Sequence, residues 1–272
     1  MSIDQSIKLK FKELKERKEI ALVVYITAGF PSFAESINNI RLIAKNGADM
    51  IEIGVPFSDP VADGPTIQYS SGVALSRGVN LGRIIRAVKS LKLNTPLILM
   101  SYLNPLLAYG KERLLNDIKE AGFRGIIIPD LPVEEADDLL MLTQRHNVDF
   151  IFLVAPTSSR DRIKIISERS RGFIYCVSST GTTGMKDKLP TALFDLIVNV
   201  RELTDKPIAV GFGISNPEQI RALSTKVDGV IVGSRIIEAI KNGQDLPVII
   251  RGLKDACVVS NSSLRQRLRR VN

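Results

Sequence analysis

The chain has 272 residues, of which 44% are hydrophobic and 24% are charged, as is usual for a soluble globular protein. Its apolar runs are far shorter than the roughly 18–20 residues that a membrane-spanning helix requires, which argues against a helical membrane protein. Lysine and arginine outnumber aspartate and glutamate by 37 to 29, but these cations are scattered, which favours an ordinary basic surface over a nucleic-acid-binding one.

The chain start and the cysteines indicate a reducing compartment. Residues 1–19 are charged and lack the apolar core of a secretory signal. Cys176 and Cys257 show no spacing typical of a disulfide framework or a metal site, and His146, the only histidine, lies at an expected helix end. No nucleotide-binding or metal-binding motif is present. We therefore expect a protein of the cytoplasm or the plastid stroma that holds no metal and no cofactor of its own.

In chain order, an amphipathic segment at roughly 4–17 is followed by eight short apolar runs that alternate with longer segments of helical periodicity. Near-continuous apolar strands are typical of a parallel sheet that is covered on both faces. We predict one domain over residues 1–272, a (β/α)8 TIM barrel with an extra N-terminal helix. An open, doubly wound sheet is the alternative, since periodicity does not show closure. The predicted strands are 20–28, 50–55, 96–102, 125–130, 149–156, 172–178, 207–213 and 228–234.

Two acids mark the end of the second predicted strand. In "IEIGVPFSDPVADGPTIQ" (51–68), Glu52 alternates with Ile51 and Ile53, so it is expected to point into the barrel. A buried carboxyl group there is either a paired core acid or a catalytic acid–base with a raised pKa. Asp63 follows in a proline-restricted loop, where it is either a second catalytic acid or the cap of the next helix. Asp59, in the same loop, is the weaker catalytic candidate.

Glycines lie at the ends of the last two predicted strands, where this barrel class often binds phosphate. Gly213 ends the seventh run, and Gly233 and Ser234 end the eighth and open a helical run. Backbone N–H groups at such turns and at a helix N-terminus attract anions. The long polar segment 178–190 after the sixth strand is a connection or a lid, and it contributes Gly184 as a further phosphate donor. Tyr175, in the sixth strand, points either inward or outward.

Six motifs in this order resemble the tryptophan synthase alpha chain family: "GVPFSDPVADGPTIQ", "SYLNP", "GIIIPDLPVEE", "TGTTG", "GFGIS" and "VIVGSRII". The resemblance covers about residues 10–255, and the first motif is long and highly specific. It implies a (β/α)8 lyase that splits indole-3-glycerol phosphate into indole and glyceraldehyde 3-phosphate in tryptophan biosynthesis. It also implies a beta chain partner in an α2β2 heterotetramer, which binds pyridoxal phosphate and receives the indole.

The same resemblance implies roles for individual residues. The motif match makes Glu52 and Asp63 the catalytic acids and places Tyr175 beside the reacting centre. The phosphate is expected at Gly184, Phe212, Gly213, Gly233 and Ser234, and the indole at Tyr25, Met100, Tyr102 and Ile127. The surface that meets the beta chain is expected to include Pro56, Asp59, Asn104 and Pro132.

The chain departs from the family pattern at a few positions. Ser179 and Thr180 stand where an arginine and an alanine are frequent, and Phe30 stands where an aspartate is common. The excess of lysine and arginine over aspartate and glutamate is also unusual for this family, and it leaves an organellar, plastid-encoded origin open. The alternatives are a related phosphate-binding barrel such as a sugar-phosphate isomerase, a binding or activating subunit that has lost catalysis, and a nucleic-acid-binding protein.

Overall fold

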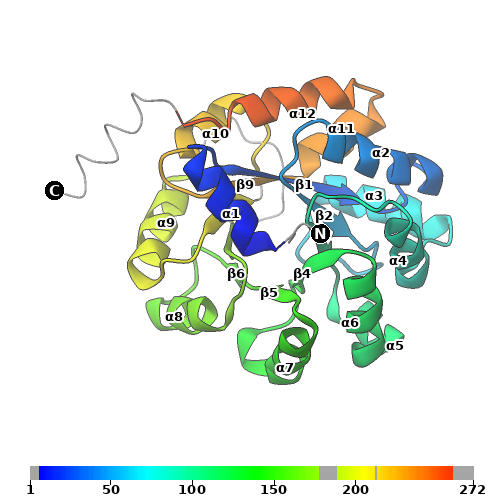
Figure 1. Ribbon diagram of the computed structural model, residues 1–272, viewed down its shortest axis with the longest axis horizontal. Helices are drawn as coiled ribbons and strands as arrows, with labels where there is room; N and C mark the ends of the chain where they lie inside the picture. Colours follow the sequence, from blue (N-terminus) through cyan, green and yellow to red (C-terminus); the bar gives the residue numbers. More distant parts are fainter. Residues whose placement is uncertain (1–5, 178–188, 212, 260–272) are drawn as a thin grey trace.

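The computed structural model describes residues 6–177, 189–211 and 213–259. Within these ranges, nine short parallel strands form a single sheet surrounded by helices (Figure 1). Each predicted run overlaps a strand, the fourth strand begins two residues before its run, and the fifth run contains two strands. The strands are β1 Ala21–Thr27, β2 Met50–Gly54, β3 Leu97–Met100, β4 Phe123–Ile127, β5 Asp149–Ile151, β6 Leu153–Val154, β7 Ile174–Val177, β8 Ile208–Gly211 and β9 Gly229–Val232.

The barrel closes at Phe152, which separates β5 from β6. The sheet order runs from β5 through β4, β3, β2, β1, β9, β8 and β7 to β6, so its two ends are consecutive in the chain. The Phe152 N–H donates to Ser170 Oγ at 3.0 Å, while its carbonyl accepts from the N–H of Tyr175 at 3.1 Å. Both backbone groups are thus satisfied where the strand changes its partner. The predicted (β/α)8 barrel is confirmed, and an open sheet is excluded.

Helices occupy the connections, and α1 lies across one end of the barrel (Figure 1). The expected N-terminal helix is confirmed as α1, and several helices begin at a Ser, Asn or Asp whose side chain accepts an N–H of the first turn. The helices are α1 Ile7–Glu16, α2 Phe33–Lys45, α3 Pro65–Ser76, α4 Leu81–Lys89, α5 Leu103–Tyr109, α6 Lys111–Glu120, η1 Val133–Glu135, α7 Asp137–His146, α8 Arg160–Arg169, α9 Thr191–Leu203, α10 Pro217–Leu223, α11 Ser234–Lys241 and α12 Leu246–Asp255.

Alternate residues of each strand enter two separate cores, as the period of two requires. Ile51 and Ile53 belong to the larger core between the sheet and the helices, whereas Met50 belongs to the smaller core inside the barrel. Phe11 of α1 joins that inner core against Phe173, with ring centroids 5.7 Å apart. Apolar side chains therefore fill the end that α1 covers, and the polar inward groups lie near the carboxyl ends of the strands. No described helix is long and apolar enough to cross a membrane.

Candidate active site

Glu52 places a carboxyl group inside the barrel, and one of its oxygen atoms has no hydrogen-bond partner among the described residues. It pairs in register with Tyr25 on β1 and Ile98 on β3, both members of the inner core, and only 1% of its surface is exposed. No ion pair of Glu52 occurs among the described residues, and its Oε2 atom is buried without a hydrogen bond. An unpaired buried carboxyl group is costly, which argues against a purely structural acid.

Asp63 points its side chain at the same pocket rather than capping a helix. The N-cap of α3 is Gly64, no side chain caps this end, and Pro65 occupies the first turn. The cap interpretation of Asp63 is therefore wrong. The loop is held by its backbone, because the Asp63 N–H donates to the Pro60 carbonyl at 3.0 Å and Gln68 Nε2 donates to the Asp63 carbonyl at 2.8 Å. This leaves the carboxyl group, 7% exposed, available to a ligand.

Two tyrosines cross the barrel interior over glycines of the neighbouring strands. A Cβ atom at Gly54 would lie 2.2 Å from Tyr25 Oη, and one at Gly211 would lie 2.3 Å from Tyr175 Oη. Neither position leaves room for a side chain, so the glycines allow the rings to lie flat and bring both hydroxyls to the pocket. Tyr175, whose direction was left open, thus points inward and belongs to the inner core.

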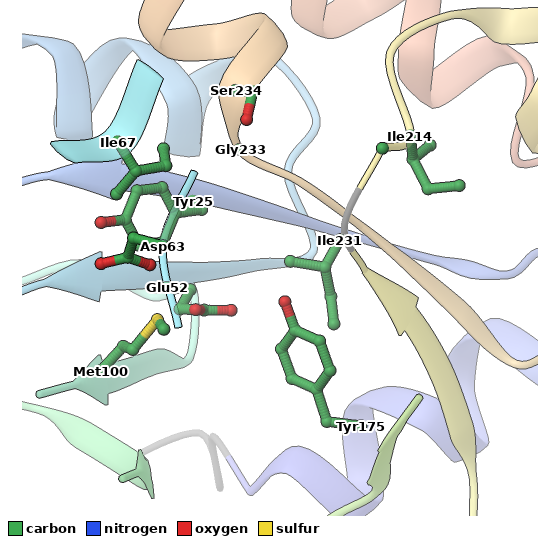
Figure 2. A pocket seen from close by; sticks show the side chains of 11 residues that line it. Tyr25, Glu52, Asp63, Ile67, Met100, Tyr175, Ile214, Ile231, Gly233 and Ser234 are labelled. Carbon is green, nitrogen blue, oxygen red and sulfur yellow. The ribbon is translucent and has the colours of Figure 1, made fainter. Parts of the chain in front are cut away.

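One pocket is lined by most of the residues predicted to be catalytic or to bind the substrate (Figure 2). In the figure, Tyr25, Glu52, Asp63 and Met100 form one side, and Tyr175 with Ile231 lies opposite. Sequence reasoning missed Ile231, although it shares the inward parity of β9. It also missed Ile67, in the first turn of α3, and Ile214, which directly follows the seventh predicted strand. The lining is Tyr25, Glu52, Asp63, Ile67, Met100, Tyr175, Gly213, Ile214, Ile231, Gly233 and Ser234.

The glycine turns reach the same pocket from the far side. Gly213 has a φ of +83°, a conformation that favours glycine. Gly233 and Ser234 form the start of α11, where no side chain caps the helix. The N–H groups of this turn lie at a pocket that already contains two acids, and they suit an anionic group held away from those acids. Gly184 and Phe212, the other two predicted phosphate residues, lie outside the described residues, as do Ser179 and Thr180.

Tyr102 and Ile127 are not part of the pocket lining. Tyr102 lies behind Asp63: its Oη accepts the N–H of Ala62 at 3.0 Å and its ring stacks on Phe57 at 5.1 Å. It also forms a side-chain hydrogen bond with Asp63. Ile127 lies completely buried in the inner core. Tyr102 therefore contacts the loop that carries Asp63, while Ile127 packs inside the barrel.

The two acids have different electrostatic surroundings. Burial, reinforced by the negative charge of Asp63, raises the pKa of Glu52 to about 8. Burial also raises the pKa of Asp63, to about 6, although the hydrogen bond from Tyr102 opposes this change. At neutral pH the arrangement favours a protonated Glu52 beside an ionised Asp63. Among the described residues, no group of three or more His, Cys, Asp or Glu side chains is placed to hold a metal ion.

The predicted partner-binding residues lie in the loop after β2, at the start of α5 and in the loop after β4, at the same end as the pocket. Asp59, Asn104 and Pro132 are exposed, whereas Pro56 is buried. Asp130 links the loop after β4 to the start of α5, since its Oδ1 accepts the N–H of Leu103 at 2.9 Å.

Val61, which sequence reasoning missed, is 82% exposed in the loop that carries Asp59. It is the most exposed large hydrophobic side chain among the described residues.

Comparison with known proteins identifies the family. The family described as "Tryptophan synthase alpha chain" matches residues 11–261. The alpha chain of Methanosarcina mazei is 46% identical over 257 residues, covering 93% of this chain and 94% of that protein. The chain belongs to the tryptophan synthase alpha chain family.

Further relatives and solved structures match most of the chain. The alpha chain of Trichodesmium erythraeum is 45% identical, with 86% of this chain and 89% of that protein covered. The solved tryptophan synthase of Mycobacterium tuberculosis superposes with a TM-score of 0.90 at 33% identity, covering 94% of this chain and all of that one. The alpha subunit from Legionella pneumophila gives 0.83 at 32% identity, with 92% and 97% covered.

Family membership settles the activity. The chain is a carbon–carbon lyase of tryptophan biosynthesis that cleaves indole-3-glycerol phosphate to indole and glyceraldehyde 3-phosphate. The alpha chain family works without a cofactor; pyridoxal phosphate belongs to the beta chain, its partner.

Proposed function

We propose that Glu52 and Asp63 carry out this cleavage as an acid–base group and a charge-stabilising group, respectively. The observation that carries the proposal is the unpartnered Glu52 Oε2 atom, buried in the pocket that Asp63 also lines. Cleaving the bond between indole C3 and the glycerol chain leaves an electron pair on C3. That carbon is a poor leaving group until it is protonated.

Glu52 in its protonated form supplies the proton to C3. The ring then carries positive charge at its nitrogen, and the Asp63 carboxylate stabilises this charge by accepting the N–H. The C3–carbon bond breaks, the adjacent hydroxyl becomes the aldehyde, and the Glu52 carboxylate takes the hydroxyl proton. Glu52 ends protonated as it began, so no net proton is gained or lost. Tyr175 lines the pocket opposite these groups and is assigned to packing beside the reacting carbon.

Phosphate recognition is assigned to Gly213, Gly233 and Ser234, with Gly184 and Phe212 as expected contributors. The uncapped N-terminus of α11 supports this assignment, because its free N–H groups and its dipole favour an anion. Tyr25 and Met100 are assigned to the indole, since both line the acid-bearing wall.

The exposed surface formed by Asp59, Val61, Asn104 and Pro132 is proposed to bind the beta chain in an α2β2 assembly. Its support is its position at the pocket end of the barrel, from which indole must leave. The compartment, cytoplasm or plastid stroma, stays a prediction, since relatives from Methanosarcina mazei and Synechocystis sp. match at 46% and 42% identity.

Replacing each acid by its amide tests the assignment. Glu52→Gln and Asp63→Asn are each expected to lower kcat for indole release at least about 100-fold, the usual scale for a positioned acid or base. Turnover is followed by absorbance with the beta chain present. Glu120→Gln, an exposed acid on α6, is the matched control and should turn over normally. A near-normal rate in either amide variant would remove that residue from the mechanism.

A further inference from the structure

Three buried hydroxyl groups connect the pocket to helix α3. Tyr25 Oη lies 3.3 Å from Thr27 Oγ1, which lies 2.7 Å from Ser70 Oγ. Ser70 Oγ in turn donates to the carbonyl of Ile67 at 2.8 Å. Thr27 and Ser70 are completely buried and Tyr25 nearly so, so this chain of hydroxyls is shielded from bulk water.

The direction of these hydrogen bonds follows from counting hydrogens. Three hydroxyls carry three hydrogens, there are three contacts, and the terminal carbonyl only accepts. Every contact is filled only if Ser70 donates to Ile67, Thr27 donates to Ser70, and Tyr25 donates to Thr27. Any other assignment leaves two buried oxygen atoms facing each other without a hydrogen, which is unfavourable.

The Tyr25 hydrogen therefore points to Thr27, and the remaining lone pairs of its oxygen are left for the pocket. The ring is held in place at both ends. A Cβ atom at Gly233 would lie 3.3 Å from Tyr25 Cβ, and one at Gly54 would lie 2.2 Å from its hydroxyl oxygen. The base of the side chain thus contacts the start of α11, while the hydroxyl points toward the acid-bearing strand β2, away from the phosphate turn (Figure 2).

We propose that Tyr25 accepts a hydrogen bond from the substrate, and that Thr27 and Ser70 hold its hydroxyl in the accepting orientation. The inference rests on the proposed function, since it takes indole-3-glycerol phosphate as the ligand. Two kinds of donor on that molecule lie away from the phosphate: the glycerol hydroxyls, and the indole N–H, which Tyr25 would share with the Asp63 carboxylate. Tyr25 would contact one of them directly, and Thr27 and Ser70 would act as positioning residues.

Three variants separate this role from simple packing. Tyr25→Phe removes the acceptor and keeps the ring, so KM is expected to rise about 3- to 10-fold, the effect of one hydrogen bond between neutral groups, with a smaller change in kcat. In Ser70→Ala, the Thr27 hydroxyl loses its acceptor and donates to Tyr25 instead. The Tyr25 hydrogen then points into the pocket, so Tyr25 no longer accepts from the substrate. A similar rise in KM is expected. Added to Tyr25→Phe, Ser70→Ala should have no further effect, because no hydroxyl is left to reorient.

The donor is identified with an inert analogue in which a propyl chain replaces the glycerol chain. This probe keeps the indole N–H and the phosphate and lacks the side-chain hydroxyls. If Tyr25→Phe weakens its binding as much as it raises KM, the indole N–H is the donor; an effect confined to the natural substrate assigns a glycerol hydroxyl. Ser71→Ala, at the next buried serine of α3, is the matched control.

Two outcomes would overturn the inference. One is unchanged KM and analogue affinity in Tyr25→Phe, and the other is a full-sized Ser70→Ala effect that persists in the Tyr25→Phe background. Either result, obtained while the unaltered protein cleaves indole-3-glycerol phosphate through Glu52 and Asp63, leaves the proposed function intact. Normal turnover in both amide variants would instead overturn the proposed function.

Discussion

At the scale of single residues, two carboxyl groups in one pocket acquire different protonation states from their surroundings. Glu52 is enclosed by the strands and is affected by the negative charge of Asp63, whereas Asp63 receives a hydrogen bond from Tyr102. Burial disfavours ionisation in both, but the hydrogen bond favours the charged form of Asp63 only. Their pKa values therefore separate, to about 8 for Glu52 and about 6 for Asp63. This separation lets one group donate a proton while the other stays charged.

These values predict a bell-shaped pH dependence of kcat/KM. Asp63 must be ionised, so the rate should fall as the pH decreases through about 6; Glu52 must be protonated, so it should fall as the pH increases through about 8. Tyr102→Phe removes the hydrogen bond that lowers the Asp63 pKa and should move only the acidic limb, to higher pH. Initial rates measured from pH 5 to 9 check this. A flat profile over this range, or an acidic limb that Tyr102→Phe leaves in place, would contradict it.

At the scale of elements, an ion-pair cluster joins α12 to the segments before β1 and β2, at the end of the barrel where the strands begin. Lys254 of α12 lies 2.8 Å from the Glu19 carboxylate and 2.7 Å from that of Asp49. Asp49 also accepts the N–H of Leu22, the second residue of β1, at 2.8 Å. Burial lowers the pKa of Lys254, but its two acidic partners outweigh burial and raise it overall. The cluster therefore links α12 to the residues just before β1 and β2, away from the catalytic end.

Removing the shared cation should destabilise the protein without affecting the chemistry. Lys254→Ala leaves the buried Asp49 carboxylate without its cation, while Glu19 keeps Arg17 as a partner; a buried pair that loses one partner costs about 3–5 kcal/mol. A lower Tm is expected in thermal unfolding followed by circular dichroism, with kcat/KM unchanged well below that temperature. Lys89→Ala breaks an exposed pair with Glu120 and should cost only about 0–1 kcal/mol. Equal stability losses in the two variants would refute the role of the cluster.

At the scale of the whole molecule, the barrel separates stability from function. Helix α1 and the Lys254 cluster lie at the end from which the strands begin, and the pocket and exposed loops lie at the end where they finish. Loops at that end can differ in sequence without disturbing the sheet. The described strands form one closed sheet, and a single domain over residues 1–272 stays a prediction.

Val61 offers a test of the surface proposed for the beta chain. Val61→Asp places a charge where an apolar side chain is 82% exposed, and burying that charge in an interface is unfavourable. Affinity for the beta chain, measured by calorimetric titration, is expected to fall at least about 10-fold, equivalent to about 1.4 kcal/mol. Val198→Asp on α9, 56% exposed on the outer ring, is the control. Equal affinities of the two variants for the beta chain would show that Val61 is not part of the interface.

Much of this arrangement was present in local sequence patterns. Alternation of Glu52 with Ile51 and Ile53 predicted an inward carboxyl group, because side-chain direction in a strand depends only on parity. The apolar runs predicted the strands, and the glycines after the seventh and eighth runs predicted the turns that meet the pocket. The motifs around Glu52 and Asp63 indicated the family. Helix α5 was not predicted, because a segment of 7 residues is too short to show helical periodicity.

By itself, then, the sequence determined the alternation of elements, the inward direction of Glu52 and the family. Only the tertiary structure decided that the barrel closes at Phe152, that Asp63 does not cap α3, and that Tyr175 points inward over Gly211. It alone brought Ser70 within 2.7 Å of Thr27, 43 positions earlier in the chain. The physical reason is that periodicity reports neighbours along a strand or helix, whereas closure and hydrogen-bond direction depend on groups that meet only once the chain has folded.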